Sequence, residues 1–167
     1  HRNCTLTRPC LSVWISLPEA PTTTAVSGPC TTGRGVLRSG CYLTHDHQRY
    51  TRYLCCVAER LNLRETLKPA LEVLACVQSQ PEPGLALLSM GKRDVAYDLD
   101  LPQPVWRSDG QGGAPKSVPA HWRIDALNDQ HAYLRFDPAA PQSEWPQLGE
   151  TVASGISHPC TTFDKWR

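Results

Sequence analysis

Hydrophobic residues recur at two different spacings along this chain. Between residues 45 and 63, apolar and aromatic residues return every three or four positions, which is the period of one helical face. Beyond residue 69 they fall instead into short runs separated by turns rich in Gly, Pro and Asp, a pattern typical of β-strands. These runs predict strands over 70–78, 85–90, 121–127, 132–136 and 151–156. We therefore expect a helix followed by a small antiparallel sheet or barrel.

The segment before the helix has a different character. Residues 36–43 (VLRSGCYL) form an apolar run broken by Ser-Gly, which predicts a strand that ends in a glycine turn. Strand, turn and helix together indicate the last βα unit of an α/β domain. Residues 1–34 are dominated by Thr, Ser, Pro and Gly and show no sustained helix or strand period, so we expect a disordered or loop-like head.

Length and charge narrow the classes of protein that need to be considered. The 167 residues suit one globular domain, or one domain and part of another, and 17 basic against 16 acidic residues give a net charge of +1. This balance offers no surface-wide attraction for nucleic acid or anionic membranes. No run approaches the ~20 apolar residues of a bilayer span, and no secretory signal is visible. The expected compartment is the cytoplasm.

The eight cysteines allow either a disulfide framework or reduced thiols. A framework is typical of small secreted proteins that lack a core, whereas the later part of this chain is rich in Val, Leu, Trp and Tyr. Cys55 and Cys56 are adjacent and cannot easily pair with each other. We therefore favour reduced thiols.

The sharpest candidate for chemistry is the pair His158 and Cys160. If the segment is extended, positions i and i+2 lie on one face, so both side chains could bind one ion. Imidazole nitrogen and thiolate sulfur are ligands that Zn²⁺ accepts, and two protein ligands would leave positions open for catalysis. A chance His-x-Cys pair is the alternative, and the motif alone does not decide between them.

Other polar segments have simpler explanations. The glycine turn over Arg38–Tyr42 could bind a phosphate through backbone N–H groups, or could be an ordinary βα turn. Residues 45–47 (HDH) could be a metal pair, but a helix cap centred on Asp46 is favoured. Residues 91–94 predict a solvated turn and residues 128–131 a hairpin loop, where the role of His131 stays open.

Four segments, taken in order, resemble one family. From Val36 to Arg167, about four fifths of the chain, the sequence is similar to the C-terminal part of bacterial amino-acid deaminases, which are relatives of eukaryotic-type D-serine dehydratase and D-threonine aldolase. The segments that carry the resemblance are 37–47 (LRSGCYLTHDH), 91–98 (GKRDVAYD), 127–132 (LNDQHA) and 155–166 (GISHPCTTFDKW).

The resemblance implies an architecture and a set of site residues. The expected fold is mainly β: a small antiparallel sheet or barrel over 69–167, preceded at 35–68 by the last βα unit of an incomplete (β/α)8 barrel. The implied cofactors are pyridoxal 5'-phosphate, bound near Gly40, Cys41 and Tyr42, and Zn²⁺, bound by His158 and Cys160. The catalytic lysine of such enzymes belongs to a part of the barrel that this chain lacks, and Lys92 is not its replacement.

The resemblance also implies an activity for the full-length protein. We expect a pyridoxal-phosphate-dependent lyase that deaminates D-amino acids carrying a β-hydroxyl, with the zinc ion acting as a Lewis acid on that hydroxyl. A D-threonine-aldolase-type lyase and a non-catalytic zinc-binding fragment are the alternatives. The soft thiolate of Cys160 favours zinc and elimination. The partner is a small D-amino acid, and a homodimer is compatible with the resemblance. We expect the chain to be a fragment, with a head that a frame shift or a truncated gene would explain.

Overall fold

A computed structural model describes residues 15–17, 34–36, 43–109 and 113–166. The chain divides into two units, residues 1–42 and 43–167. In the first unit, β1 (Ile15–Leu17) pairs antiparallel with β2 (Arg34–Val36). Two short strands thus lie at positions where the sequence predicted loop, disorder or the start of a barrel strand. Residues 37–42, including Gly40, Cys41 and Tyr42, lie outside the described part of the chain.

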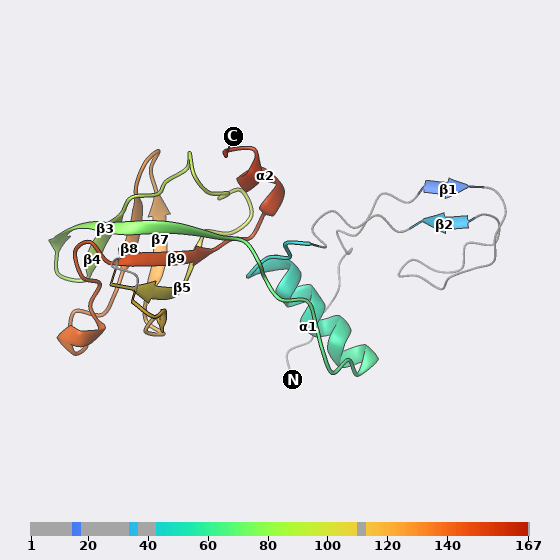
Figure 1. The fold of residues 1–167 in the computed structure, drawn as a ribbon, viewed down its shortest axis with the longest axis horizontal. Coiled ribbons are helices and arrows are strands. Elements are labelled where there is room, and N and C mark those ends of the chain that lie inside the picture. The colour runs from blue at the N-terminus through green and yellow to red at the C-terminus, as the bar shows by residue number, and fades with distance from the viewer. Residues whose placement is uncertain (1–14, 18–33, 37–42, 110–112, 167) are drawn as a thin grey trace. The chain divides into compact units, whose positions relative to one another are not determined.

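The second unit is mainly β, as predicted. Within the residues that the structure describes, its sheet has seven antiparallel strands in the order β6-β5-β9-β3-β4-β8-β7. Figure 1 labels all of these strands except β6. The five predicted strands are all present, as β3 (Glu72–Glu82), β4 (Leu85–Leu88), β7 (Arg123–Leu127), β8 (Ala132–Arg135) and β9 (Thr151–Gly155). The sheet curls as a half-barrel, which brings β5 close to β7 although the two strands are not paired.

The long strand β3 produces much of this curl. Its first half pairs with β9, from Glu72 to Cys76, and its second half pairs with β4. Irregularities in the register after Val77 and after Ser79 bend the strand, since a bulge increases local twist. The sequence predicted a strand that ends at residue 78, but β3 continues to Glu82 and the turn is confined to the next two residues.

The core lies on one face of the sheet. Along β3, Val73, Ala75 and Val77 are buried while the intervening Leu74 is exposed, which is the alternation expected of a strand with one covered face. The other buried hydrophobic residues of the cluster come from the remaining strands and their loops: Ala86, Leu88, Met90, Val95, Trp122, Ile124, Ala132, Leu134, Phe136, Val152 and Ile156.

Two strands of the larger sheet were not predicted from the sequence. They are β5 (Gln103–Ser108) and the two-residue strand β6 (Lys116–Ser117). Pro104 lies near the start of β5, and the register with β9 shifts between Pro104 and Trp106. Because proline cannot donate to a ladder, a proline in a short run argues against a strand unless such an irregularity accommodates it.

The predicted helix is α1 (Arg49–Leu61), and it ends at Asn62 in the left-handed conformation. None of its residues is buried within the part of the chain that the structure describes. A 3-10 helix, η1 (Gln142–Glu144), lies between β8 and β9. A final short helix, α2 (Pro159–Phe163), closes the described chain. Among the described residues, neither α1 nor α2 has the length and apolar character needed to cross a bilayer.

Candidate functional site

His158 and Cys160 lie at the start of a helix and not in a strand. Pro159 occupies the first position of α2, where its fixed φ favours the helix and its missing N–H costs nothing. His158 precedes the helix with φ −144° and ψ 87°. The prediction that residues 158–160 form an extended segment is therefore wrong, because Pro159 and Cys160 are helical. The shared direction of the two side chains no longer follows from strand geometry, because residues i and i+2 of a helix do not face each other. Their role as metal ligands stays a prediction.

A carboxylate holds one nitrogen of the His158 ring. Nδ1 lies 2.6 Å from Oδ2 of Asp98, and the Thr161 hydroxyl lies 3.2 Å from the other carboxylate oxygen. The His158 side chain is 29% exposed and that of Asp98 is 45% exposed, so the pair borders solvent. Burial of Asp98 is the largest single influence and favours its neutral form, but the hydrogen bonds from His158, from the Asp98 backbone and from Thr161, together with the charge of His158, outweigh it and hold the pKa of this carboxyl below its usual value.

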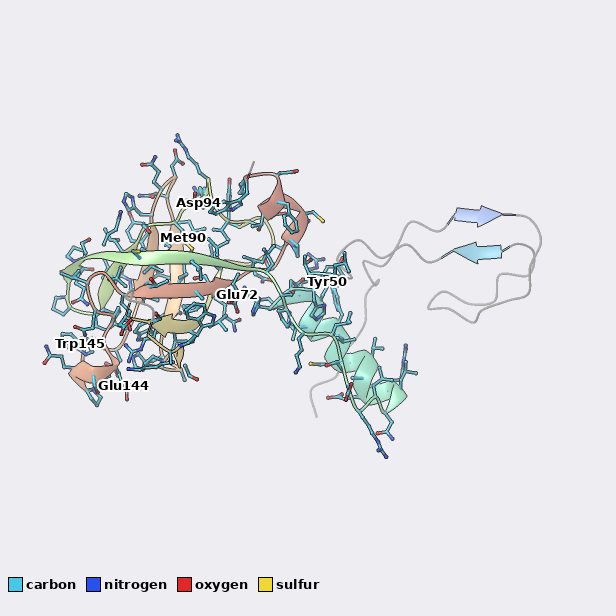
Figure 2. The ribbon with its side chains drawn as sticks, in the orientation of Figure 1. Tyr50, Glu72, Met90, Asp94, Glu144 and Trp145 are labelled. Atoms are coloured by element: carbon cyan, nitrogen blue, oxygen red, sulfur yellow. The ribbon has the colours of Figure 1, made fainter. Side chains whose placement is uncertain are left out.

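The loop that carries Asp98 is tied to α2 at several points. The buried Thr162 side chain accepts the backbone N–H of Ala96 at 3.1 Å. Beyond the helix, the ammonium group of Lys165 donates to the carbonyl of Lys92 at 2.8 Å. The indole N–H of Trp166 donates to the carbonyl of Asp94 at 2.7 Å. The labels of Met90 and Asp94 mark the start of this loop in Figure 2. Two of the segments that carry the family resemblance, 91–98 and 155–166, are thus joined to each other by hydrogen bonds.

The segment 127–132, which also carries the resemblance, is hydrogen-bonded to the same loop. The 128–131 loop joins β7 and β8 as predicted, and the side-chain oxygen of Asn128 accepts the N–H groups of Gln130 and His131. Lys92 N–H donates to Asn128 at 2.8 Å, and the next backbone N–H, of Arg93, donates to Asp129 at 3.2 Å. The predicted turn at 91–94 is also present, closed by the bond from Asp94 N–H to the carbonyl of Gly91.

The 45–47 segment behaves as a helix cap. The buried Asp46 carboxylate accepts the N–H of Gln48 at 2.8 Å and the N–H of Tyr50 at 3.0 Å. These are N–H groups at the start of α1 that have no partner within the helix. No group of three His, Cys, Asp or Glu side chains is arranged to hold a metal within the described ranges. The structure therefore confirms the cap at Asp46.

His47 lies in a separate and only partly exposed environment. Its backbone N–H donates to Ile156, and a side chain at Gly155 would collide with its ring. Nε2 lies 3.4 Å from a carboxylate oxygen of Glu72, and the other oxygen of that group accepts the indole N–H of Trp106 at 2.7 Å. Figure 2 shows Glu72 where β3 begins. Burial lowers the pKa of His47 from its usual value, and Glu72 opposes this shift only in part.

Sequence reasoning missed the roles of Asp98 and Thr161. Asp98 stands in a segment that carries the resemblance, but 60 residues separate it from His158 along the chain. The available signal was chemical: a histidine that binds a metal usually donates its second ring nitrogen to a carboxylate or carbonyl group. That rule predicts the existence of a partner without identifying it among 16 acidic residues.

Fold and site together define a curled β domain with a carboxylate-held histidine and an exposed thiol at the start of its last helix. Residues 70–167, more than half of the chain, match the family described as "Putative serine dehydratase domain". The chain belongs to this family, which confirms the predicted kinship with D-serine-dehydratase-like proteins.

Comparisons with individual proteins add less evidence than the family match does. No curated protein matches the chain. Among solved structures, the D-threonine aldolase from Filomicrobium marinum is similar, with a TM-score of 0.46 and 25% identity over 60% of this chain. The chain covers 23% of that aldolase, so it spans about a quarter of this relative's length.

Proposed function

We propose that this domain supplies the metal-binding end of the active site in a pyridoxal-phosphate- and zinc-dependent ammonia-lyase. The substrate is a D-amino acid with a β-hydroxyl group, and the products are a keto acid and ammonia. The observation that supports this proposal most strongly is the position of His158 and Cys160 at the solvent-bordering start of α2, inside the region that matches the serine dehydratase family.

The donor types at His158 and Cys160 suit a zinc ion with open positions. One ring nitrogen of His158 is held by Asp98, and the other has no hydrogen-bond partner among the described residues. The Cys160 side chain is exposed. Imidazole and thiolate together suit Zn²⁺, and two protein ligands leave places for water or substrate, as a catalytic site requires. Bound there, Zn²⁺ would supply Lewis-acid chemistry at the substrate hydroxyl.

The residues of this chain have limited and separate roles in the proposal. His158 and Cys160 would hold the ion, while Gly40, Cys41 and Tyr42 would bind the cofactor phosphate. When bound, pyridoxal phosphate would supply an electron sink at the substrate α-carbon. Lys92 is not the catalytic lysine. Its ammonium group lies over the Tyr97 ring, 5.5 Å from the centroid, and its carbonyl accepts a bond from Lys165.

The proposed setting is the cytoplasm, with a small D-amino acid as partner and without nucleic acid or membrane. Cys55 and Cys76 carry free thiols, which agrees with a reducing compartment. The net charge of +1 supplies no general attraction for polyanions.

Product analysis on the complete protein tests this function. Incubation with D-serine or D-threonine should release keto acid and ammonia, and removal of zinc by a chelator should stop the release until Zn²⁺ is restored. The L-isomers serve as controls and should not react. Glycine and an aldehyde as products from D-threonine would show retro-aldol chemistry instead. Undiminished keto-acid release after verified removal of zinc would contradict the metal assignment.

A further inference from the structure

The contact between Asp98 and His158 fixes where the proton of the imidazole lies. A carboxylate can only accept hydrogen bonds, so in the neutral ring Nδ1 must carry the hydrogen and Nε2 must carry the lone pair. The separation of 2.6 Å is short even for a bond to a charged acceptor, which indicates a strong interaction. The lone pair of Nε2 is the group that a metal ion requires.

Asp98 is well placed to hold this tautomer although its side chain borders solvent. It follows the buried residues Val95 and Ala96, and the N–H of Ala96 is bonded to Thr162 in α2. The Thr161 hydroxyl lies 3.2 Å from Oδ1 of Asp98 and 3.2 Å from the carbonyl of His158. The carboxylate is therefore supported by the same helix whose start it orients, and the arrangement does not rest on one contact alone.

We propose that Asp98 is a positioning residue that holds His158 as the Nδ1–H tautomer and thereby directs Nε2 at a Zn²⁺ ion. The metal part of this inference rests on the proposed function, whereas the tautomer part does not. A carboxylate behind a metal-binding histidine fixes the ring and makes its free nitrogen more basic. Loss of such partners usually lowers metal affinity by about 10–100-fold.

The tautomer is measured in the metal-free 167-residue chain by long-range ¹H–¹⁵N correlation of the histidine rings, with His158 assigned from a His158→Ala spectrum. The wild-type chain should show the Nδ1–H form at a pH where the spectrum shows the ring to be neutral. Asp98→Ala should lose this preference and shift His158 toward the Nε2–H form, which predominates in free histidine. Asp98→Asn should retain the Nδ1–H form, because the amide oxygen still accepts the bond.

Zinc affinity is measured on the same proteins by competition with a chromophoric chelator, with Zn²⁺ alone as the probe and His158→Ala as the background. Asp98→Ala should bind about 10–100-fold more weakly than wild type, and Asp98→Asn should fall between them. Asp100→Ala is the matched control. Asp100 pairs with Arg52 at 2.8 Å, and its two contacts with Ser157 use backbone atoms that alanine retains.

The possible results separate the inference from the function on which it rests. A wild-type tautomer and wild-type zinc affinity in Asp98→Ala would overturn the inference. Equal weakening by Asp100→Ala would also overturn it, because the effect would then be a general loosening of the loop. If the wild-type chain shows the Nδ1–H form but binds no more zinc than His158→Ala, the metal assignment fails while the tautomer assignment stands.

Discussion

Gly91 makes a close backbone contact that can be tested by one added methyl group. A Cβ at this position would lie 2.5 Å from the carbonyl carbon and oxygen of Asp129 and from the nitrogen of Gln130. Ordinary contacts between such atoms are about 3.5–4.0 Å, so the two loops would have to separate by about 1 Å. The hydrogen bonds from Lys92 and Arg93 to the 128–131 loop oppose this movement.

The expected cost of Gly91→Ala follows from these contacts. Overpacking costs about 1–3 kcal/mol, and weakening one interloop hydrogen bond adds about 1 kcal/mol. A total of about 2–4 kcal/mol corresponds to a fall in the unfolding midpoint of roughly 8–16 °C for a unit of this size.

Thermal unfolding followed by tryptophan fluorescence measures this loss, since Trp122 is buried in the core. Arg93→Ala is the control in the same turn. Its side chain is exposed and lies 3.9 Å from the carboxylate of Asp129, and exposed pairs of this kind contribute little. The midpoint of the control should therefore remain near that of the wild type. A Gly91→Ala midpoint within about 2 °C of wild type would refute the close contact between the two loops.

Three further changes test other parts of the account. Asp46→Ala should destabilise the chain by about 1–2 kcal/mol in denaturant unfolding, and the stability of Asp46→Asn should be nearer that of wild type. Loss of bound zinc in Asp46→Ala would contradict the role of Asp46 as a helix cap. His47 has a lowered pKa in the folded state, so the unfolded state binds more protons just below about pH 6.5 and stability should rise with pH through that window. His47→Phe should flatten this rise relative to wild type, and an unchanged slope would contradict the burial effect. In the complete enzyme, His158→Ala or Cys160→Ala should remove zinc and most activity while leaving the visible spectrum of the cofactor intact, and full turnover by Cys160→Ala would exclude the thiolate as a ligand.

The strands with uninterrupted alternation could be predicted from the sequence, because burial of one face requires apolar residues at every second position. In β3, the buried residues Val73, Ala75 and Val77 show this alternation. In β5 the strand could not be predicted, because it contains Pro104. The register irregularity beside Pro104 is defined by pairing with β9, which is distant in sequence. The cap at Asp46 could be predicted because its partners are local in sequence.

The site was predicted only in part, for a related reason. The sequence supplies the donor types at His158 and Cys160, but the short helix α2 is held by contacts with a distant loop, including the bond between Thr162 and Ala96. A pattern read along the chain could not reveal these contacts. The same limit hid Asp98, whose partnership with His158 depends on how the 91–98 loop packs against α2.

The proposal that His158 and Cys160 bind one zinc ion is tested most directly by anomalous X-ray scattering at the zinc edge from crystals of the complete protein. We expect one strong anomalous peak about 2.0–2.1 Å from Nε2 of His158 and about 2.3 Å from the sulfur of Cys160, with Asp98 still bonded to Nδ1. A peak at other residues, or none beside these two in crystals grown with Zn²⁺, would contradict the claim.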